Sequence, residues 1–347
     1  MAEAPMHDAA ARAAISGELA SLHLRVAQPE DPPLFTRTPS SSMQPIHWKA
    51  ADLALMLHKI GAELKLEEGG QRRTLRLTNP GLKEGTTPTF WCSIQVILPG
   101  EVASAHRHTA TALRFIMRGR GADTTVEGER YEMNEGDLLL TPNWTWHDHA
   151  HAGDAPMVWL DVLDINLMKS LHATFFEPGT AARMPVNAHP QASFAQFGSA
   201  LMRPLNQRQH GLFSPILGYH RAQAEAALAA AATLPPDPFD DTALEYQNPT
   251  TGGPALPTIG TALQRLRPGF QGQAHRHTGS VVYYVVRGSG VSSVAGNAYH
   301  WGAGDFIAVP PWAAHAHANP TGTEAVLFQV NDIPVMQALG FWREEAC

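Results

Sequence analysis

Two kinds of hydrophobic pattern alternate along the chain. Apolar residues recur at helical spacing over residues 50–64, and residues 215–233 contain the alanine-rich run RAQAEAALAAAAT, so each segment predicts a helix. From about residue 72, short β-type runs such as FWCSIQVILPG and LRFIMRGRG are bounded by glycine, proline or asparagine, and the pattern resumes at about residue 246. This punctuation predicts many short strands joined by turns. The polar, alanine-rich residues 1–30 predict a helical arm.

The two strand-rich regions repeat each other. The pentapeptide AHRHT occupies residues 105–109 and again 274–278, and Asn79 recurs as Asn248 at the same shift of 169 residues. A register kept over many positions indicates an internal duplication. We therefore expect four segments. They are an arm with a helix that packs on the barrels (1–85), a first β-domain (86–175), a linker with a helix (176–245) and a second β-domain (246–347).

The composition excludes several classes of partner. Charged residues make up 16% of the 347, and the formal net charge is −7 without a basic run, so a nucleic-acid binder is not expected. Cys92 and Cys347 cannot form a disulfide framework or a CxxC metal motif. No run reaches the roughly 18 apolar residues of a membrane span, and no signal-peptide pattern opens the chain. We expect a cytoplasmic protein.

Alternating histidines carry the main candidate chemistry. His106 and His108 are separated by one residue, and side chains at i and i+2 of a strand share a face. His147 and His149 alternate in the same way. Imidazoles are common ligands of transition metals, so His106, His108 and His147 predict a metal site.

A glycine, the paired histidines, a second glycine, a proline and a last histidine follow one another at matching spacing in both halves. This order resembles the two motifs of the cupin superfamily, whose members are jelly-roll barrels with a metal inside. We therefore expect an all-β bicupin, with two jelly-roll barrels, an N-terminal helical arm and a helical linker. His275, His277 and His315 predict a second metal site. Many cupins add a glutamate ligand after the paired histidines, but Ala112 and Leu113 stand there, which leaves positions on a metal open.

Three polar residues follow the predicted ligands of the first half. Arg114 lies six residues after His108 and shares its face if the strand is unbroken; its guanidinium suits a carboxylate, although it could also pair with a surface acid. His149 could handle a proton or be a hydrogen-bonded core residue. Asp161 could orient a histidine or an arginine, or belong to a turn.

The segments PGEVASAHRHTATALRFI, VEGERYEMNEGDLLLTPNWTWHDH and VWLDVLD resemble the gentisate 1,2-dioxygenase family, which includes salicylate and 1-hydroxy-2-naphthoate dioxygenases. The resemblance runs from about residue 45 to the C-terminus. It implies Fe(II) on His106, His108 and His147, and ring opening of gentisate or a related 5-substituted salicylate by O2 between the carboxyl-bearing and hydroxyl-bearing carbons. Salicylate and 1-hydroxy-2-naphthoate are alternative substrates. A homo-oligomer, tetramer or dimer, is also implied.

The resemblance further implies roles for individual residues. The implied catalytic residues are Arg114, His149 and Asp161. The implied substrate contacts are Trp91, Gln95, Arg114 and an arginine of RRTLR, for which Arg72 and Arg76 are the best matches. Tyr283 stands at the place of Arg114 in the second half, so we expect catalysis in the first half only.

Other functions of a bicupin remain open from the residues alone. An oxalate-type decarboxylase is disfavoured by the missing glutamate ligand, and dioxygenases of β-diketones or sulfur compounds by the motifs just quoted. A non-catalytic metal-binding bicupin for storage or sensing should lose its polar pocket residues in both halves, whereas the first half keeps Arg114, His149 and Asp161.

Overall fold

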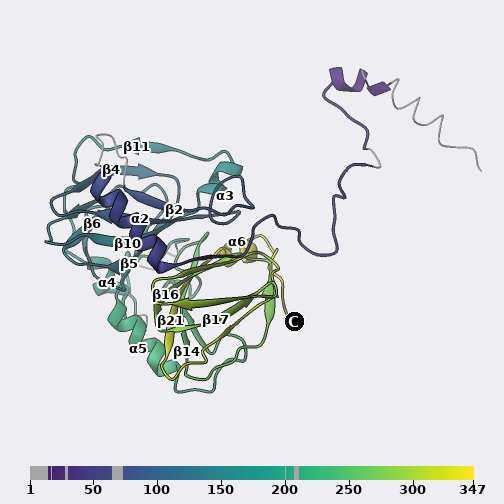
Figure 1. Ribbon diagram of the computed structural model, residues 1–347. Coiled ribbons are helices and arrows are strands. Elements are labelled where there is room, and N and C mark those ends of the chain that lie inside the picture. The colour runs from purple at the N-terminus through teal and green to yellow at the C-terminus, as the bar shows by residue number, and fades with distance from the viewer. Residues whose placement is uncertain (1–14, 17, 28–29, 65–72, 200, 207–210) are drawn as a thin grey trace, which may run out of the picture. The chain divides into compact units, whose positions relative to one another are not determined.

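A computed structural model describes residues 15–16, 18–27, 30–64, 73–199, 201–206 and 211–347. The chain divides into two compact units, Met1–Ser40 and Ser41–Cys347. In the first unit, helical residues lie between 15 and 21, and much of the predicted helical arm falls outside the described residues. The second unit contains two β-barrels and confirms the all-β bicupin fold (Figure 1).

The first barrel is formed by eight consecutive strands and three added ones. Its strands are β3 (Trp91–Ile97), β4 (Val102–His108), β5 (Ala112–Arg118), β6 (Ala122–Val126), β7 (Glu129–Met133), β8 (Leu138–Thr141), β9 (His147–His151) and β10 (Met157–Leu163). The added strands are β2 (Thr74–Leu77), β11 (Phe176–Pro178) and β12 (Gly218–Tyr219). They form two sheets, in the orders β12-β8-β5-β10-β3-β2 and β11-β4-β9-β6-β7.

The second barrel repeats this arrangement. Its strands are β14 (Gly260–Leu266), β15 (His275–His277), β16 (Val281–Arg287), β17 (Ser289–Val294), β18 (Asn297–Gly302), β19 (Phe306–Val309), β20 (His315–Ala318) and β21 (Ala325–Asn331). The added strands are β1 (Ile46–Trp48), β13 (Thr242–Glu245) and β22 (Glu344–Ala346). The sheet orders are β1-β19-β16-β21-β14-β13 and β18-β17-β20-β15-β22.

The helices are short and connect or flank the barrels. They are α2 (Ala50–Glu63), α3 (Ile165–Ser170), α4 (Ala192–Phe197), α5 (Arg221–Ala231) and α6 (Ile333–Ala338). The helices predicted over 50–64 and within 215–233 are α2 and α5. No helix in the described part of the chain has both the length and the apolar character needed to cross a bilayer.

A large hydrophobic core joins the two barrels. Alternate residues of β3, including Ile94 and Val96, point outward into this core, and Phe115 stacks on Phe328 of the other barrel with ring centroids 4.0 Å apart. The other face of β3 carries Gln95 and points into the first barrel, because neighbouring side chains of a strand lie on opposite faces. Both faces of these strands are therefore buried, one against the second barrel and one around the first barrel's interior.

The segment before each barrel is attached to the other barrel. Strand β1 pairs with β19 of the second barrel, while β12, which precedes the second barrel, pairs with β8 of the first. Asp305 accepts a hydrogen bond from the Ala50 amide at the start of α2 (2.7 Å), and Asp137 accepts one from the Arg221 amide at the start of α5 (2.8 Å). A carboxylate at a helix N-terminus satisfies a free amide and complements the helix dipole. This reciprocal exchange ties the duplicated halves together.

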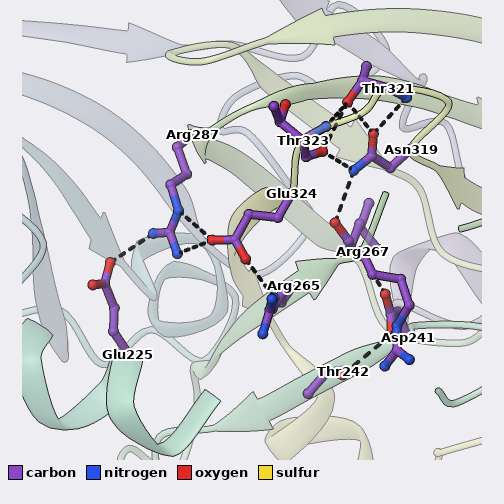
Figure 2. Close-up of polar contacts among 11 residues, drawn as sticks. Glu225, Asp241, Thr242, Arg265, Arg267, Arg287, Asn319, Thr321, Thr323 and Glu324 are labelled. Atoms are coloured by element: carbon purple, nitrogen blue, oxygen red, sulfur yellow. Dashed lines mark hydrogen bonds and ion pairs between the residues drawn. The ribbon is translucent and has the colours of Figure 1, made fainter. Parts of the chain in front are cut away.

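Ion pairs fix α5 on the second barrel (Figure 2). Arg287 joins Glu225 of α5 (2.8 Å) to Glu324 (2.9 Å), and Arg265 reaches the same Glu324 (2.8 Å). The hydrogen bond from Arg287, aided by Arg265, lowers the pKa of Glu324 although partial burial opposes this. Linked pairs hold one another in place better than an isolated surface pair does. The linker helix is thus anchored through its polar face.

Buried hydrogen bonds across the barrel interface should contribute measurably to stability. Asp332 is fully buried and accepts hydrogen bonds from Ser280 of its own barrel and from the Thr89 hydroxyl of the first barrel (2.6 Å). We expect Thr89→Val to lower the free energy of unfolding by about 1–3 kcal/mol, because a buried carboxyl group loses one of its donors. Urea unfolding measures this loss, and the exposed Thr233→Val is the control. Equal losses in both variants would contradict the prediction.

Candidate metal centre

Three histidines converge inside the first barrel. His106 and His108 lie on β4, and His147 opens β9 directly opposite His106 in the strand register. Their ring centroids are 4.3 to 5.4 Å apart, and their candidate ligand atoms all lie within 4.8 Å of one another. Alternation along β4 and pairing with β9 are therefore sufficient to place three imidazoles around one point.

The backbone orients each of these rings. Each Nδ1 lies 2.8 or 2.9 Å from a carbonyl oxygen, and a carbonyl can only accept, so Nδ1 carries the proton and Nε2 keeps its lone pair. The accepting carbonyls belong to Ser104, Ala110 and Thr145. Nε2 of His147 is buried without a hydrogen-bond partner among the described residues.

The charge state of His147 also fits a cation. Burial, aided by the Arg114 charge and the neighbouring histidines, lowers the pKa of His147 well below its usual value. This ligand is therefore neutral at physiological pH, as metal coordination requires. The three residues fit a bound divalent transition metal.

A group of buried polar residues on β5 and β10 lies beside the three histidines. Arg114 and Asp161 are directly opposite in the register, and the Arg114 Nε lies 3.0 Å from a carboxylate oxygen. Asp161 also accepts a hydrogen bond from the Trp159 indole (3.0 Å), and Arg114 Nη1 donates to the Thr141 hydroxyl (2.6 Å). Arg114 is only 2% exposed, which excludes the alternative of a surface ion pair. Burial lowers the pKa of its guanidinium and Asp161 opposes that shift.

The other predicted pocket residues fall into two groups. His149 is fully buried, with its ring 5.9 Å from His147 and 5.7 Å from Trp159. Gln95 is buried opposite Trp159 in the register, and its Oε1 has no hydrogen-bond partner among the described residues. Trp91 lies two alternations earlier on β3, beneath the Arg76 guanidinium at 4.7 Å. The structure thus places His149 and Gln95 deep in the barrel, Trp91 at the beginning of β3 and Arg76 on the neighbouring β2.

The arginines of RRTLR have different environments. Arg72 lies outside the described residues. Arg73 is buried and forms two hydrogen bonds of 2.6 Å with Glu101, so its guanidinium is already paired with a carboxylate of the protein. Arg76 is exposed and stands opposite Ser93 in the β2–β3 register, on the side of the strand that carries Trp91 and Gln95. Among the described arginines of this segment, Arg76 is the one beside the predicted pocket residues.

Trp159 and Thr141 form hydrogen bonds with the Arg114–Asp161 pair, and the sequence analysis did not single them out. Trp159 lies two residues before Asp161 and therefore shares its face, a signal that strand alternation alone could have supplied. Thr141 ends β8 just before the proline of the second motif. Its contact with Arg114 depends on the pairing of β8 with β5, which no local pattern reveals.

The second barrel keeps the trio but changes its surroundings. The ring centroids of His275, His277 and His315 are 4.4 to 5.7 Å apart. Tyr283 pairs with Gln329 in the register, where the first barrel pairs Arg114 with Asp161. The second interior therefore has no counterpart of that buried ion pair.

Buried neutral histidines should make the metal-free protein sensitive to acid. Burial lowers the pKa of His317 to about 3 and that of His277 to about 4, against about 6.5 in an unfolded chain. Below pH 6.5 the unfolded state then binds more protons than the folded state. The free energy of unfolding therefore decreases as the pH is lowered, by about 1.4 kcal/mol per pH unit for each group. Urea unfolding with chelator between pH 7.5 and 5 measures this slope, and His317→Gln should reduce it. A flat profile would contradict the prediction.

Comparisons with known proteins agree with this geometry. The cupin domain family model matches residues 93–163 and 262–331. The chain is 40% identical over 317 residues to 5-aminosalicylate 1,2-dioxygenase from Comamonas sp, covering 89% of this chain and 83% of the relative. It is 38% identical over 315 residues to gentisate 1,2-dioxygenase 1 from Aquipseudomonas alcaligenes, covering 90% and 89%.

A solved structure is similar over the whole chain. Salicylate 1,2-dioxygenase from Pseudoaminobacter salicylatoxidans, solved as an adduct with gentisate, superposes with a TM-score of 0.89 at 32% identity. The match covers 100% of this chain and 95% of that one. Both barrels, and not only the motif region, therefore have counterparts in a solved relative.

Proposed function

This chain belongs to the gentisate 1,2-dioxygenase family of ring-cleaving bicupins, and on that premise we propose that it opens gentisate or a related 5-substituted salicylate with O2. The observation that carries the proposal is the buried Arg114–Asp161 pair beside three inward-facing imidazoles. A cation held next to a metal site favours a substrate that brings a negative charge to both. An aromatic hydroxy acid has that charge in its carboxylate.

The proposed metal is Fe(II), held by His106, His108 and His147. When bound there, it supplies Lewis acidity for the phenolate and carries the redox chemistry between the ring and O2. The protein contributes three imidazole ligands oriented by backbone carbonyls. The candidate group among the described residues consists of three histidines and contains no acidic side chain. Coordination positions on the metal would therefore stay available to the substrates.

Arg114 is the proposed receptor of the substrate carboxylate. Its Nε faces Asp161 and its Nη1 donates to Thr141, so the plane of the guanidinium is fixed before substrate arrives. No hydrogen bond engages Nη2 within the residues that the structure describes. Such preorganisation saves side-chain entropy on binding. Asp161 therefore acts through Arg114, as the residue that orients it.

His149 is the proposed handler of the phenolic proton. It follows the ligand His147 by two residues on β9 and contacts both its ring and that of Trp159. An imidazole in that place can accept the hydroxyl proton or hold it in a hydrogen bond as the ring becomes electron-rich. Gln95 would contact the ring substituents from β3. Trp91 and Arg76 would line the entrance.

Anaerobic loading with Fe(II), followed by a panel of aromatic acids, tests the proposal. The panel contains gentisate, 5-aminosalicylate, 5-nitrosalicylate, salicylate and 1-hydroxy-2-naphthoate, and the readouts are O2 uptake and absorbance of the ring-opened product. We expect equimolar uptake with a 5-substituted salicylate. Confirmed iron with no O2 uptake across the panel would refute the proposal.

We also propose that the protein is a cytoplasmic homo-oligomer, either a tetramer or a dimer. Light scattering measures the mass of the assembly.

A further inference from the structure

The residue between the two candidate ligands of β4 faces the outside of the first barrel. Arg107 lies between His106 and His108, and neighbouring side chains of a strand lie on opposite faces. Its side chain is only 27% exposed, although it lies on the outer surface. The guanidinium is therefore covered by other side chains, and these contacts decide what Arg107 does.

Two indole rings pack on the Arg107 guanidinium. The guanidinium carbon lies 4.5 Å from the ring centroid of Trp144 and 4.7 Å from that of Trp146. A cation within about 6 Å of an aromatic ring is attracted to its face, and the planar guanidinium also stacks there. Both tryptophans belong to residues 142–146, the turn between β8 and β9. Arg107 thus attaches this turn to β4.

The 142–146 turn has a strained backbone. Trp144 has a φ of 59°, in the left-handed region that a bulky side chain rarely adopts. Its amide donates a hydrogen bond to the His108 carbonyl (2.9 Å). Such conformations persist only where the surrounding structure fixes them. The contacts of the two indoles with Arg107 are therefore part of what keeps the turn in place.

The turn in its place orients His147. Thr145 lies between the two tryptophans, and its carbonyl accepts the hydrogen bond from Nδ1 of His147 (2.9 Å). A partner on the outer nitrogen of a ligand histidine fixes the direction in which the inner nitrogen points. If the turn relaxed, Thr145 would move and the His147 ring would lose this orientation.

The opposite side of Arg107 holds a second element of the site. Its Nε and Nη2 donate to Oε2 of Glu177 at 2.8 and 2.6 Å, and Glu177 lies directly opposite Arg107 in the β4–β11 register. The neighbouring Phe176 stacks on His106 with ring centroids 5.4 Å apart. One guanidinium therefore joins β4, the 142–146 turn and β11, each of which contacts or carries a candidate ligand.

The second barrel contains a reduced copy of this arrangement. Arg276 lies 5.0 Å from the ring centroid of Trp312, and its Nε donates to Glu345 (2.7 Å). Trp312 also has a positive φ, 64°. Ala314 stands in the place of Trp146, so one indole is missing. Arg276 is therefore a matched control for Arg107 on the other barrel.

We propose that Arg107 is a positioning residue, which acts from the outer face of the barrel to keep His147 and His106 oriented toward a metal ion. It does so through the indoles of the 142–146 turn and through Glu177 of β11. This deepens the proposed function and rests on it, because it requires a metal on His106, His108 and His147.

Titration of the metal-free full chain with Co²⁺ tests the proposal without turnover. All variants are made in a His315→Ala background, so that only the histidine trio of the first barrel is complete. We expect Arg107→Met to weaken Co²⁺ binding by about 10- to 100-fold, as is typical when a residue that orients a ligand is lost. The visible absorption bands should also change, because they report the number and geometry of the ligands.

Arg276→Met in the same background is the control, and it should leave both the affinity and the bands unchanged. Thermal unfolding of the metal-free variants measures any general loss of stability. Unchanged Co²⁺ affinity and bands in Arg107→Met, even with lowered stability, would show that Arg107 is only structural. Equal losses of affinity in the two variants would overturn the proposal as well.

Glu177→Gln is a milder test that keeps Arg107 and its indoles. We expect a smaller loss of Co²⁺ affinity than in Arg107→Met, in the same direction, and no loss in Glu345→Gln, which changes the partner of Arg276. A loss in Glu345→Gln that matches that in Glu177→Gln would contradict the proposal. Absence of Co²⁺ binding in the His315→Ala background itself would instead refute the metal site of the proposed function, and this inference with it.

Discussion

Arg114→Met is expected to lower kcat/KM for the preferred aromatic acid by between about 10²- and 10⁴-fold. The guanidinium is 2% exposed and oriented by Asp161 and Thr141, so no surface cation can replace it. Leaving a buried charge without its partner costs about 3–5 kcal/mol, and each 1.36 kcal/mol corresponds to a factor of ten in rate. Steady-state kinetics with O2 uptake measure the loss, and iron content should stay at the wild-type level.

The same substitution also leaves Asp161 without its ion-pair partner, so its effect on stability needs a separate control. Arg114→Met combined with Asp161→Asn removes both charges and should recover much of any lost stability, since a neutral pair carries no uncompensated charge. Activity should stay low in the double variant because the proposed carboxylate receptor is still missing. Recovery of activity together with stability would show that Arg114 acts only as a partner of Asp161.

His147→Ala is expected to abolish turnover. This residue is fully buried, lies beside the other two histidines and keeps an Nε2 without a partner among the described residues, so its loss removes one of the three proposed metal ligands. The bound metal is the proposed carrier of the O2 chemistry, which amino-acid side chains do not ordinarily supply. Turnover should be measured together with iron content in the same preparations.

The comparison variant lies in the duplicated barrel. His315→Ala removes the corresponding histidine from an interior that has Tyr283 in place of the arginine, and we expect turnover to fall by less than about tenfold. Circular dichroism verifies that both variants are folded. Similar losses in the two variants would show that the barrels share the catalysis, contrary to the assignment to the first barrel.

Strand alternation made the grouping of the three candidate ligand histidines predictable. His106 and His108 share a face because β4 is extended between them, and the pairing of β4 with β9 brings His147 opposite. The duplicated spacing then predicted two barrels, because the same short strands and turns recur in one register. These features depend on local backbone geometry, which a sequence pattern reports directly.

Contacts between strands that are distant in the chain were harder to predict from the sequence. The sequence offered Arg72 and Arg76 as alternatives and could not exclude Arg73, whose pairing with Glu101 depends on how β2 and the turn after β3 fold together. Nor did it show that β1 joins the second barrel and β12 the first. Such choices follow from tertiary packing of similar short strands, and a repeated sequence is compatible with either partner.

Isotope labelling with ¹⁸O2 tests most directly the claim that this chain opens an aromatic ring with both atoms of dioxygen. The Fe(II)-loaded wild type should be allowed to turn over the preferred acid of the panel, and the product analysed by mass spectrometry in unlabelled water. We predict two labelled oxygen atoms in the ring-opened product. An unlabelled product would contradict this prediction, and so would a product that keeps its ring and carries a single labelled atom.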